Sequence, residues 1–309
     1  VSNFMSHTPQ ISYTIQHPND DYCIIVINDF EYYGALTDNL YELEGCLFAT
    51  ISDAEISKFI DNVQPEHIQS KDIPLYNLPL FRARYNEGDG WQDDSKQFTY
   101  NHDQQKCKLY RLNKAGEQVL YTSTNPYVAC NEIARTESNN SIFLTMFMAQ
   151  NKTETIKLAL CMPGVGKVSG NAKKYANYLS QKDDAAINYH ERLGNIIEAD
   201  IPPNISPDVI YQKTAALASK ILNTHDAIMT VSKKSNMSEL NITLKKDIVD
   251  KLLKIKRIFE INITDESVHI LRIGKDKNGK IKWHKCGFMN FYWSCWLQLR
   301  FHSRKYLKA

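Results

Sequence analysis

The sequence predicts an α+β fold, and three observations lead to that prediction. Hydrophobic residues make up 43% of the 309 residues, which is ordinary for a globular protein with a sizeable core. Many short apolar runs have the composition of strands. They do not alternate regularly with helices, as the βαβ units of a doubly wound parallel sheet do. Apolar residues recur at helical spacing in residues 207–223 and 244–255, so helices accompany the strands.

Residues 1–75 are predicted to form a separate, small N-terminal unit of unknown role. They contain far more Asp and Glu than Lys and Arg, so the unit is acidic. The β-branched run at 22–28 predicts a strand. A helix is expected at 52–63, and it ends before Pro65. Residues 67–80 are interpreted as a linker or extended arm.

Residues 76–263 are predicted to be the main domain. Its polar segment 86–106 is expected to be a loop that can cover a site. Strands are expected at 80–85, 119–123, 141–149, 156–162, 227–231 and 257–263. Helices are expected at 127–136, 175–179, 185–190, 207–223 and 244–255.

Residues 264–309 are predicted to be a basic, aromatic C-terminal extension. The apolar runs 268–273 and 281–284 flank a turn-forming segment, which predicts a hairpin. Aromatic residues with interspersed Arg and Lys fill 288–306, and three interpretations stay open for them. The segment packs on the core, binds nucleic acid or lies on a membrane surface.

Cysteine usage and hydropathy bound the class of protein. The 7 cysteines are scattered without a C-x-x-C pair, which argues against a structural zinc ion and against a disulfide framework. We therefore expect no metal cofactor, and reduced, buried thiols in a cytoplasmic protein. The longest apolar runs are far shorter than a membrane span, and no segment resembles a signal peptide.

Arg111, Tyr121 and Glu132 are the strongest candidates for catalytic residues. They follow one another at intervals of ten and eleven residues, each at the edge of a different predicted element. Arg binds phosphate groups with defined, bidentate geometry. A Tyr ring can stack on a nicotinamide ring, and a carboxylate can stabilise the cation formed when an N-glycosidic bond breaks.

Further candidates would bind the dinucleotide. Arg82 or Arg84, on the predicted strand 80–85, would hold its phosphates. Ser232, at the end of the predicted strand 227–231, would bond a phosphate or the ribose.

Four segments in order resemble the RES domain family, which is named for an arginine, a glutamate and a serine. The resemblance spans roughly residues 80–263, and it departs from the family where Ala227 replaces a favoured Gly. The matching segments are Leu80-Phe81-Arg82-Ala83-Arg84, Arg111-Leu112-Asn113 with Gly116, Leu120-Tyr121-Thr122-Ser123 with Ala129 and Glu132, and 226–232 with 241–244. Ser123 thereby joins the candidates for NAD binding.

This resemblance implies a fold similar to ADP-ribosyltransferases, with a split, strongly curved sheet and flanking helices. It implies NAD as the substrate and no further cofactor. Most characterised relatives are toxins of toxin–antitoxin pairs that cleave the nicotinamide–ribose bond, with water or phosphate as acceptor. We therefore expect an NAD glycohydrolase or NAD phosphorylase that depletes NAD and arrests growth. Inorganic phosphate and a helix-turn-helix-type antitoxin are the implied partners.

Two other functions stay open at this point. The chain could be an ADP-ribosyltransferase of the same fold that modifies a protein, with residues 86–106 and 1–75 as the target surface. It could instead bind nucleic acid or another partner through its basic aromatic tail, and Glu132→Ala would then have no effect. The residues do not decide the acceptor, the trigger or whether the chain forms homo-oligomers.

Overall fold

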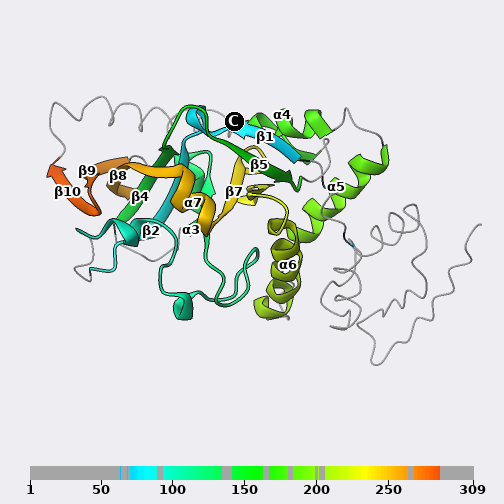
Figure 1. The fold of residues 1–309 in the computed structure, drawn as a ribbon, viewed down its shortest axis with the longest axis horizontal. Helices are drawn as coiled ribbons and strands as arrows, with labels where there is room; N and C mark the ends of the chain where they lie inside the picture. The colour runs from blue at the N-terminus through cyan, green and yellow to red at the C-terminus, as the bar shows by residue number, and fades with distance from the viewer. Residues whose placement is uncertain are drawn as a thin grey trace, which may run out of the picture.

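The fold is α+β, as the sequence predicts, and its described part contains one mixed sheet of ten strands and five α-helices (Figure 1). The computed structural model describes residues 63, 68, 70–88, 93–133, 141–162, 167–179, 184–198, 201, 206–263 and 268–285. The predicted strand 22–28, nearly all of the predicted helix 52–63 and the aromatic segment 288–306 lie outside these residues.

The strands of the sheet lie in the order β1-β5-β6-β7-β3-β2-β4-β8-β9-β10. They are β1 (Ser70–Pro74), β2 (Leu80–Tyr85), β3 (Val119–Ser123), β4 (Ile142–Ala149), β5 (Thr155–Leu160), β6 (Ala227–Val231), β7 (Leu240–Lys245), β8 (Leu253–Ile263), β9 (Val268–Lys277) and β10 (Lys280–Lys285). Strands β5 and β6 are parallel, and all the other neighbours are antiparallel.

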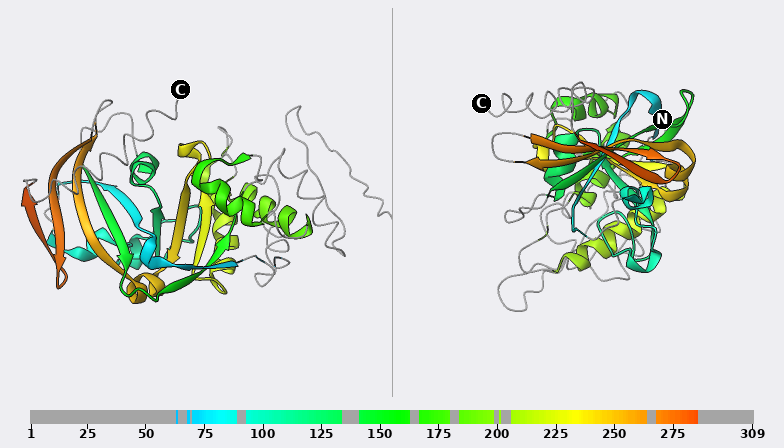
Figure 2. Two further views of the ribbon diagram at one scale, coloured as in Figure 1. Left: turned by 90° about the horizontal axis from the view of Figure 1, so that it is seen from above. Right: turned by 90° about the vertical axis from the view of Figure 1, so that its left-hand side faces the viewer.

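The sheet is divided at its centre, between β3 and β2. These two strands pair at a single position, Phe81 opposite Ser123, whereas the other neighbours described here pair over three positions or more. We call β1-β5-β6-β7-β3 the first half-sheet and β2-β4-β8-β9-β10 the second half-sheet. Figure 2 shows the two groups of strands from above, with β9 and β10 at one end.

Helices cover both faces of the first half-sheet. The helices are α3 (Pro126–Ile133), α4 (Gly170–Leu179), α5 (Asp184–Ile197), α6 (Pro207–Leu222) and α7 (Lys246–Leu252). Helices α5 and α6 pack on the face that carries Ile228, and α4 and α7 pack on the face that carries Met229. Strand β6 is buried along its whole length, which explains why its sequence, AIMTV, is nearly all apolar.

The second half-sheet is covered by α3 on one face and by a folded loop on the other. Ala129 and Cys130 of α3 pack with Phe81. On the opposite face, Phe98 of the 3₁₀-helix η4 (Ser95–Phe98) packs edge-on against Phe143, with 5.4 Å between ring centroids. The predicted loop 86–106 is therefore in part a packed layer of the fold.

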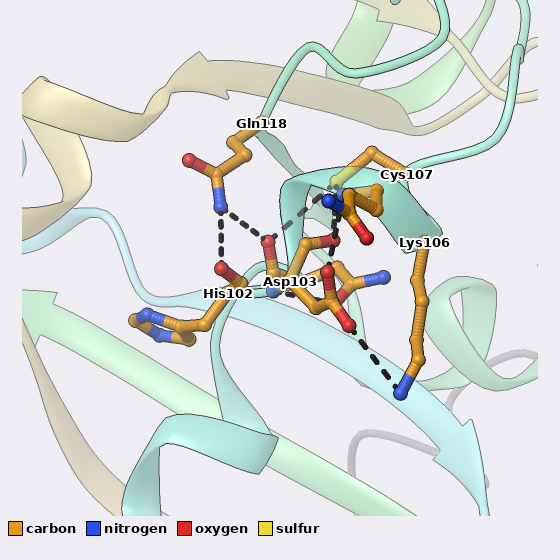
Figure 3. Close-up of polar contacts among 7 residues, drawn as sticks. His102, Asp103, Lys106, Cys107 and Gln118 are labelled. Carbon is orange, nitrogen blue, oxygen red and sulfur yellow. Dashed lines mark hydrogen bonds and ion pairs between the residues drawn. The ribbon is translucent and has the colours of Figure 1, made fainter.

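Side chains and backbone carbonyls hold this loop together (Figure 3). Gln118 Nε2 donates hydrogen bonds to the carbonyl oxygens of Asn101 and His102, at 2.8 and 3.0 Å. Lys106 Nζ lies 3.3 Å from the carboxylate of Asp103, at the 3₁₀-helix η5 (Gln104–Lys106). The segment that leads into β3 is therefore held in place by bonds among its own residues.

Several predicted elements have different bounds in the structure. The predicted helix 244–255 begins as the end of β7 and finishes as the start of β8, with only α7 between them, because both ends pair with neighbouring strands. The predicted linker 67–80 contains β1, which pairs with β5. Helix α4 begins at Gly170 and α5 continues to Ile197, both well beyond the predicted ranges.

The sheet extends across both predicted domain boundaries. Strand β1 precedes residue 76, and the hairpin β9–β10, predicted from its turn, follows residue 263 and pairs with β8. Among the described helices, none combines the length and the apolar composition needed to cross a membrane.

Candidate functional site

The side chain of Asn113 builds the turn that presents Arg111. Asn113 is buried, and its Nδ2 donates to the carbonyl oxygens of Lys108 and Lys114, at 2.9 and 2.8 Å. Its backbone exchanges hydrogen bonds with that of Tyr110. The amide of Asn113 therefore closes the chain on both sides of Arg111.

Tyr121 of β3 locks this turn against the sheet. Its hydroxyl donates to Asn113 Oδ1 at 2.9 Å and accepts from the backbone N–H of Leu112 at 2.9 Å. Burial raises the pKa of Tyr121 well above its ordinary value, so the hydroxyl stays protonated. Its oxygen is thus engaged by the protein, and any contribution of Tyr121 to ligand binding would come from the ring.

Arg111 reaches from this turn to the end of helix α5. Its Nη1 donates to the carbonyl oxygen of Ile197 at 2.6 Å, and its guanidinium carbon lies 5.7 Å from the centroid of the Tyr211 ring of α6. A cation is favoured at a helix C-terminus, where carbonyl groups lack helical partners. Helices α5 and α6 therefore fix the position of Arg111.

Glu132 lies in the last turn of α3, and two donors fix its carboxylate. Ser232 Oγ donates to Glu132 Oε1 at 2.7 Å, and Asn241 Nδ2 donates to the same oxygen at 2.9 Å. Helix α3 itself starts at an Asn cap, because Asn125 Oδ1 accepts from the backbone N–H groups of Tyr127 and Val128. The structure therefore brings together two predicted residues, Glu132 and Ser232.

Strand register places these donors on one face of the sheet, which we call the site face. Ser123 lies opposite Asn241, which in turn lies opposite Thr230. Residues that pair across antiparallel strands project to the same side, and so do alternate residues of one strand. Tyr121, two residues before Ser123, therefore shares the site face with Thr230 and Asn241.

Ser123 has a structural position at the centre of this face. It is buried, its Oγ donates to the carbonyl oxygen of Leu240 at 3.0 Å, and it accepts from the backbone N–H of Asn125 at 3.3 Å. Ser123 thus ties β3 to β7 and to the start of α3, and its predicted contact with NAD stays a prediction.

Arg82 and Arg84 are not placed beside Glu132. Because Phe81 pairs with Ser123, it lies on the site face, and the next residue, Arg82, projects from the opposite face. There Arg84 Nη1 donates to the carbonyl oxygen of Gln97 at 2.8 Å. Burial, followed by repulsion from Arg84, lowers the pKa of Arg82 to about 10. The Arg82 Nη1 atom is buried without a hydrogen-bond partner among the described residues.

A second carboxyl group, which sequence reasoning missed, lies at this site. Glu198 directly follows α5, and its side chain forms a hydrogen bond with Thr230. Burial raises the pKa of Glu198 above its ordinary value, and the nearby charge of Glu132 acts in the same direction. The charge of Arg111, the Thr230 hydrogen bond and the charge of Lys233 oppose that increase.

Three residues of the candidate site were not predicted: Thr230, Asn241 and Glu198. The sequence contains a signal for Thr230 and Asn241, and none for Glu198. Thr230 and Ser232 alternate on a strand that is otherwise apolar, so period-two reasoning could have placed both on one face. Asn241 then follows from the register of the neighbouring strand. Glu198 comes from a helix end in a long connection, where nothing in the local pattern indicates its target.

The candidate site combines charged, aromatic and carboxyl side chains from several elements. It contains one guanidinium, one aromatic ring and two carboxyl groups, supplied by a turn, a strand and two helix ends. Within the described residues, no cluster of three or more His, Cys, Asp or Glu side chains could hold a metal ion. Neither a protein-family model nor a curated protein matches this chain.

Proposed function

We propose that this protein is an NAD-cleaving enzyme of the RES type that breaks the bond between nicotinamide and ribose. The observation that carries the proposal is the Glu132 carboxylate, which Ser232 and Asn241 fix at one oxygen. Among the described residues, its second oxygen, Oε2, takes no hydrogen bond. That oxygen can therefore accept a hydrogen bond from a ligand such as a ribose.

The chemistry of the two donors suits this reaction. Breaking an N-glycosidic bond leaves positive charge on the ribose, and a carboxylate beside that carbon stabilises it. Ser232 and Asn241 are neutral, so they orient the carboxylate of Glu132 without neutralising its charge. An Arg or Lys in their place would form an ion pair and weaken the attraction for the developing cation.

The positions of Arg111 and Tyr121 also support the proposal. A guanidinium can bind the diphosphate of NAD, and Ile197 and Tyr211 hold this one in a defined place. Tyr121 lies on the same face, where its partly buried ring packs against the apolar cluster of α5 and α6, and we expect the rest of the ring to meet the nicotinamide. The single pair that joins the half-sheets is also compatible with the split sheet that the family resemblance implies.

The direct test measures nicotinamide released from NAD by the purified full chain. We expect Glu132→Gln to lower the rate by about 10²–10³-fold, because the variant keeps the shape of the side chain and loses its charge. Glu260→Gln is the matched control. Glu260 Oε1 also accepts from a Ser hydroxyl and an Asn amide, those of Ser141 and Asn86, but it lies on the second half-sheet.

Each outcome of this assay has a clear meaning. Equal release by the wild type and Glu132→Gln would contradict the proposal, as would no release with water, phosphate or protein as acceptor. Faster release on adding inorganic phosphate would identify a phosphorylase rather than a glycohydrolase. Release that requires an added protein would identify the alternative, an ADP-ribosyltransferase.

The same proposal makes a prediction for cells. Expression should lower cellular NAD and arrest growth, and a helix-turn-helix-type antitoxin would relieve the arrest. Arg111→Ala and Glu132→Ala should each restore growth, because one loses the cation for the diphosphate and the other loses the catalytic carboxylate. Colony counts and NAD measurements after induction check this, and arrest that survives both substitutions would contradict the mechanism.

A further inference from the structure

Glu198 and Glu132 are bonded to two residues of the same short stretch of chain. Thr230 is hydrogen-bonded to Glu198, and Ser232 donates to Glu132. The backbone stays extended at Ser232, with φ −90° and ψ 118°. Residues two apart in an extended chain project to the same face about 7 Å apart. The two carboxyl groups are therefore bonded to neighbouring positions on the site face.

This spacing has a chemical meaning. Glycosidases that use water directly place two carboxyl groups about 6.5–9.5 Å apart, because a water molecule has to fit between a carboxyl group and the sugar carbon. Thr230 and Ser232, which bind Glu198 and Glu132, are about 7 Å apart in an extended strand, and this spacing leaves room for the two carboxyl groups to lie on either side of a water molecule. One carboxylate can thus face the reacting carbon while the other contacts the acceptor.

We propose that Glu198 is a second catalytic carboxyl group of this site, the general base that accepts a proton from the acceptor water. This inference rests on the proposed NAD cleavage and assigns its acceptor. Glu132, held by two neutral donors, stabilises the ribosyl cation. Glu198, next to the Ile197 carbonyl to which Arg111 donates, lies beside the residue assigned to the diphosphate.

The reaction balances with water as the co-reactant. The bond between the ribose carbon and the nicotinamide nitrogen breaks, and its electron pair leaves with neutral nicotinamide. The oxygen of water forms a new bond to that carbon, and its proton passes to the Glu198 carboxylate. ADP-ribose, nicotinamide and one proton, later released from Glu198, are the products.

The electrostatic surroundings of Glu198 fit a base. Burial and Glu132 raise its pKa, while Arg111, Thr230 and Lys233 lower it. A carboxylate with a raised pKa is a stronger base than an ordinary one, provided that the pH lies above that pKa. Hydrolysis should therefore increase with pH as Glu198 loses its proton, at higher pH than for an ordinary Glu.

The test compares water with nucleophiles that need no base. We expect Glu198→Gln to slow hydrolysis of NAD by about 10²–10⁴-fold and to abolish the acidic limb of the pH–rate profile. Azide is an anion without a proton to lose. Added as its sodium salt, it should restore nicotinamide release to Glu198→Gln, with ADP-ribosyl azide as the product. It should not restore release to Glu132→Gln, because that variant cannot stabilise the cation.

A second variant separates positioning from folding. Thr230→Val keeps the shape of the side chain and removes the hydrogen bond that lowers the pKa of Glu198. Its acidic limb should therefore move to higher pH, which a general loss of folded protein would not produce. Thr243→Val on the same face, paired opposite Tyr121, is the matched control and should leave the limb unchanged.

The outcomes distinguish this inference from the function on which it rests. Hydrolysis at the wild-type rate by Glu198→Gln, with an unchanged pH profile, would overturn the role of Glu198. If Glu132→Gln were still inactive in that case, the NAD-cleaving function would stand. Loss of hydrolysis in Glu198→Gln without rescue by azide would also overturn the general-base role. A wild type that releases no nicotinamide would overturn both.

Discussion

At the scale of single residues, the site depends on polar atoms that bond to one another before any ligand arrives. Tyr121 is the best example. The sequence predicts that the Tyr121 ring stacks on a nicotinamide ring. In the structure, the Tyr121 hydroxyl accepts from the Leu112 N–H and donates to Asn113 Oδ1. The residue thus has two separable parts, a ring that can face a ligand and an oxygen that holds the turn of Arg111.

Tyr121→Phe should destabilise the protein while leaving the ring in place. The buried Asn113 Oδ1 and the Leu112 N–H would each lose a partner, so we expect the free energy of unfolding to fall by about 1–3 kcal/mol. Urea denaturation followed by circular dichroism measures this. Tyr110→Phe is the control, because Tyr110 is exposed and contacts the edge of the same ring. An equal effect of both substitutions would contradict this account.

The sequence predicted part of the site because its residues are close to a recognisable local pattern. Glu132 and Ser232 are 100 residues apart, yet the family resemblance named both, and a hydrogen bond joins them. Arg111 is predicted from its position before a turn. Glu198 could not be predicted, because its proposed role depends on the end of α5 reaching Thr230, which is a consequence of tertiary packing.

At the scale of elements, helix α3 carries Glu132 on only two turns of helix. So short a helix has little stability of its own, and it depends on its packing and its cap. Asn125 supplies that cap, and Pro126 occupies the first helical position, where a missing N–H costs nothing. The start of α3 therefore affects the position of the Glu132 carboxylate at its end, which we propose to be catalytic.

Asn125→Ala should lower the free energy of unfolding by about 1 kcal/mol, because the N–H groups of Tyr127 and Val128 lose their acceptor. Nicotinamide release should fall as well, since α3 positions Glu132. Thermal denaturation and the NAD assay measure the two effects. Asn125→Asp keeps an acceptor oxygen at the same place, so it should retain most of the stability. A loss as large as that of Asn125→Ala would argue against the cap.

Elements were predictable where local pattern and tertiary environment agree. Strand β6 and helix α6 fit their predicted ranges because one is an apolar run and the other follows a Ser cap with a Pro. The predicted helix 244–255 was wrong at both ends, because sheet pairing with β3 and β4 outweighed an apolar spacing of helical type. Half of the residues of helix α4 are polar or Gly, so its sequence carried a weak signal.

At the scale of the whole molecule, a buried histidine links stability to pH. His190 of α5 is fully buried, and its Nδ1 lies 3.0 Å from the Leu160 carbonyl oxygen, so Nδ1 carries the proton of the neutral ring. The pKa of His190 is lowered to about 4, mainly by burial and in small part by His225, although the bond to Leu160 acts in the opposite direction. The folded protein thus keeps this ring neutral at pH values where the unfolded chain protonates it.

Acid should therefore destabilise the protein between about pH 6.5 and pH 4. In this window the unfolded state binds a proton that the folded state does not, at a cost of up to roughly 3 kcal/mol. His190→Gln keeps a donor for Leu160 and should flatten the dependence of unfolding free energy on pH. Urea titrations at pH 4.5 to 7 measure it, with His284→Gln, at an exposed position, as control. An unchanged slope in His190→Gln would contradict the assignment.

The parallel pairing of β5 and β6 has a topological consequence. Two neighbouring strands that run in the same direction force the chain to leave the sheet and travel back before it can re-enter. Here that connection contains α4, α5 and α6, and it brings the Ile197 carbonyl to Arg111 and the Glu198 side chain to Thr230 of β6. The connection that a parallel pair requires thus ends in a side chain, Glu198, that reaches the candidate site without belonging to a strand, so it can be substituted without changing the pairing of the sheet.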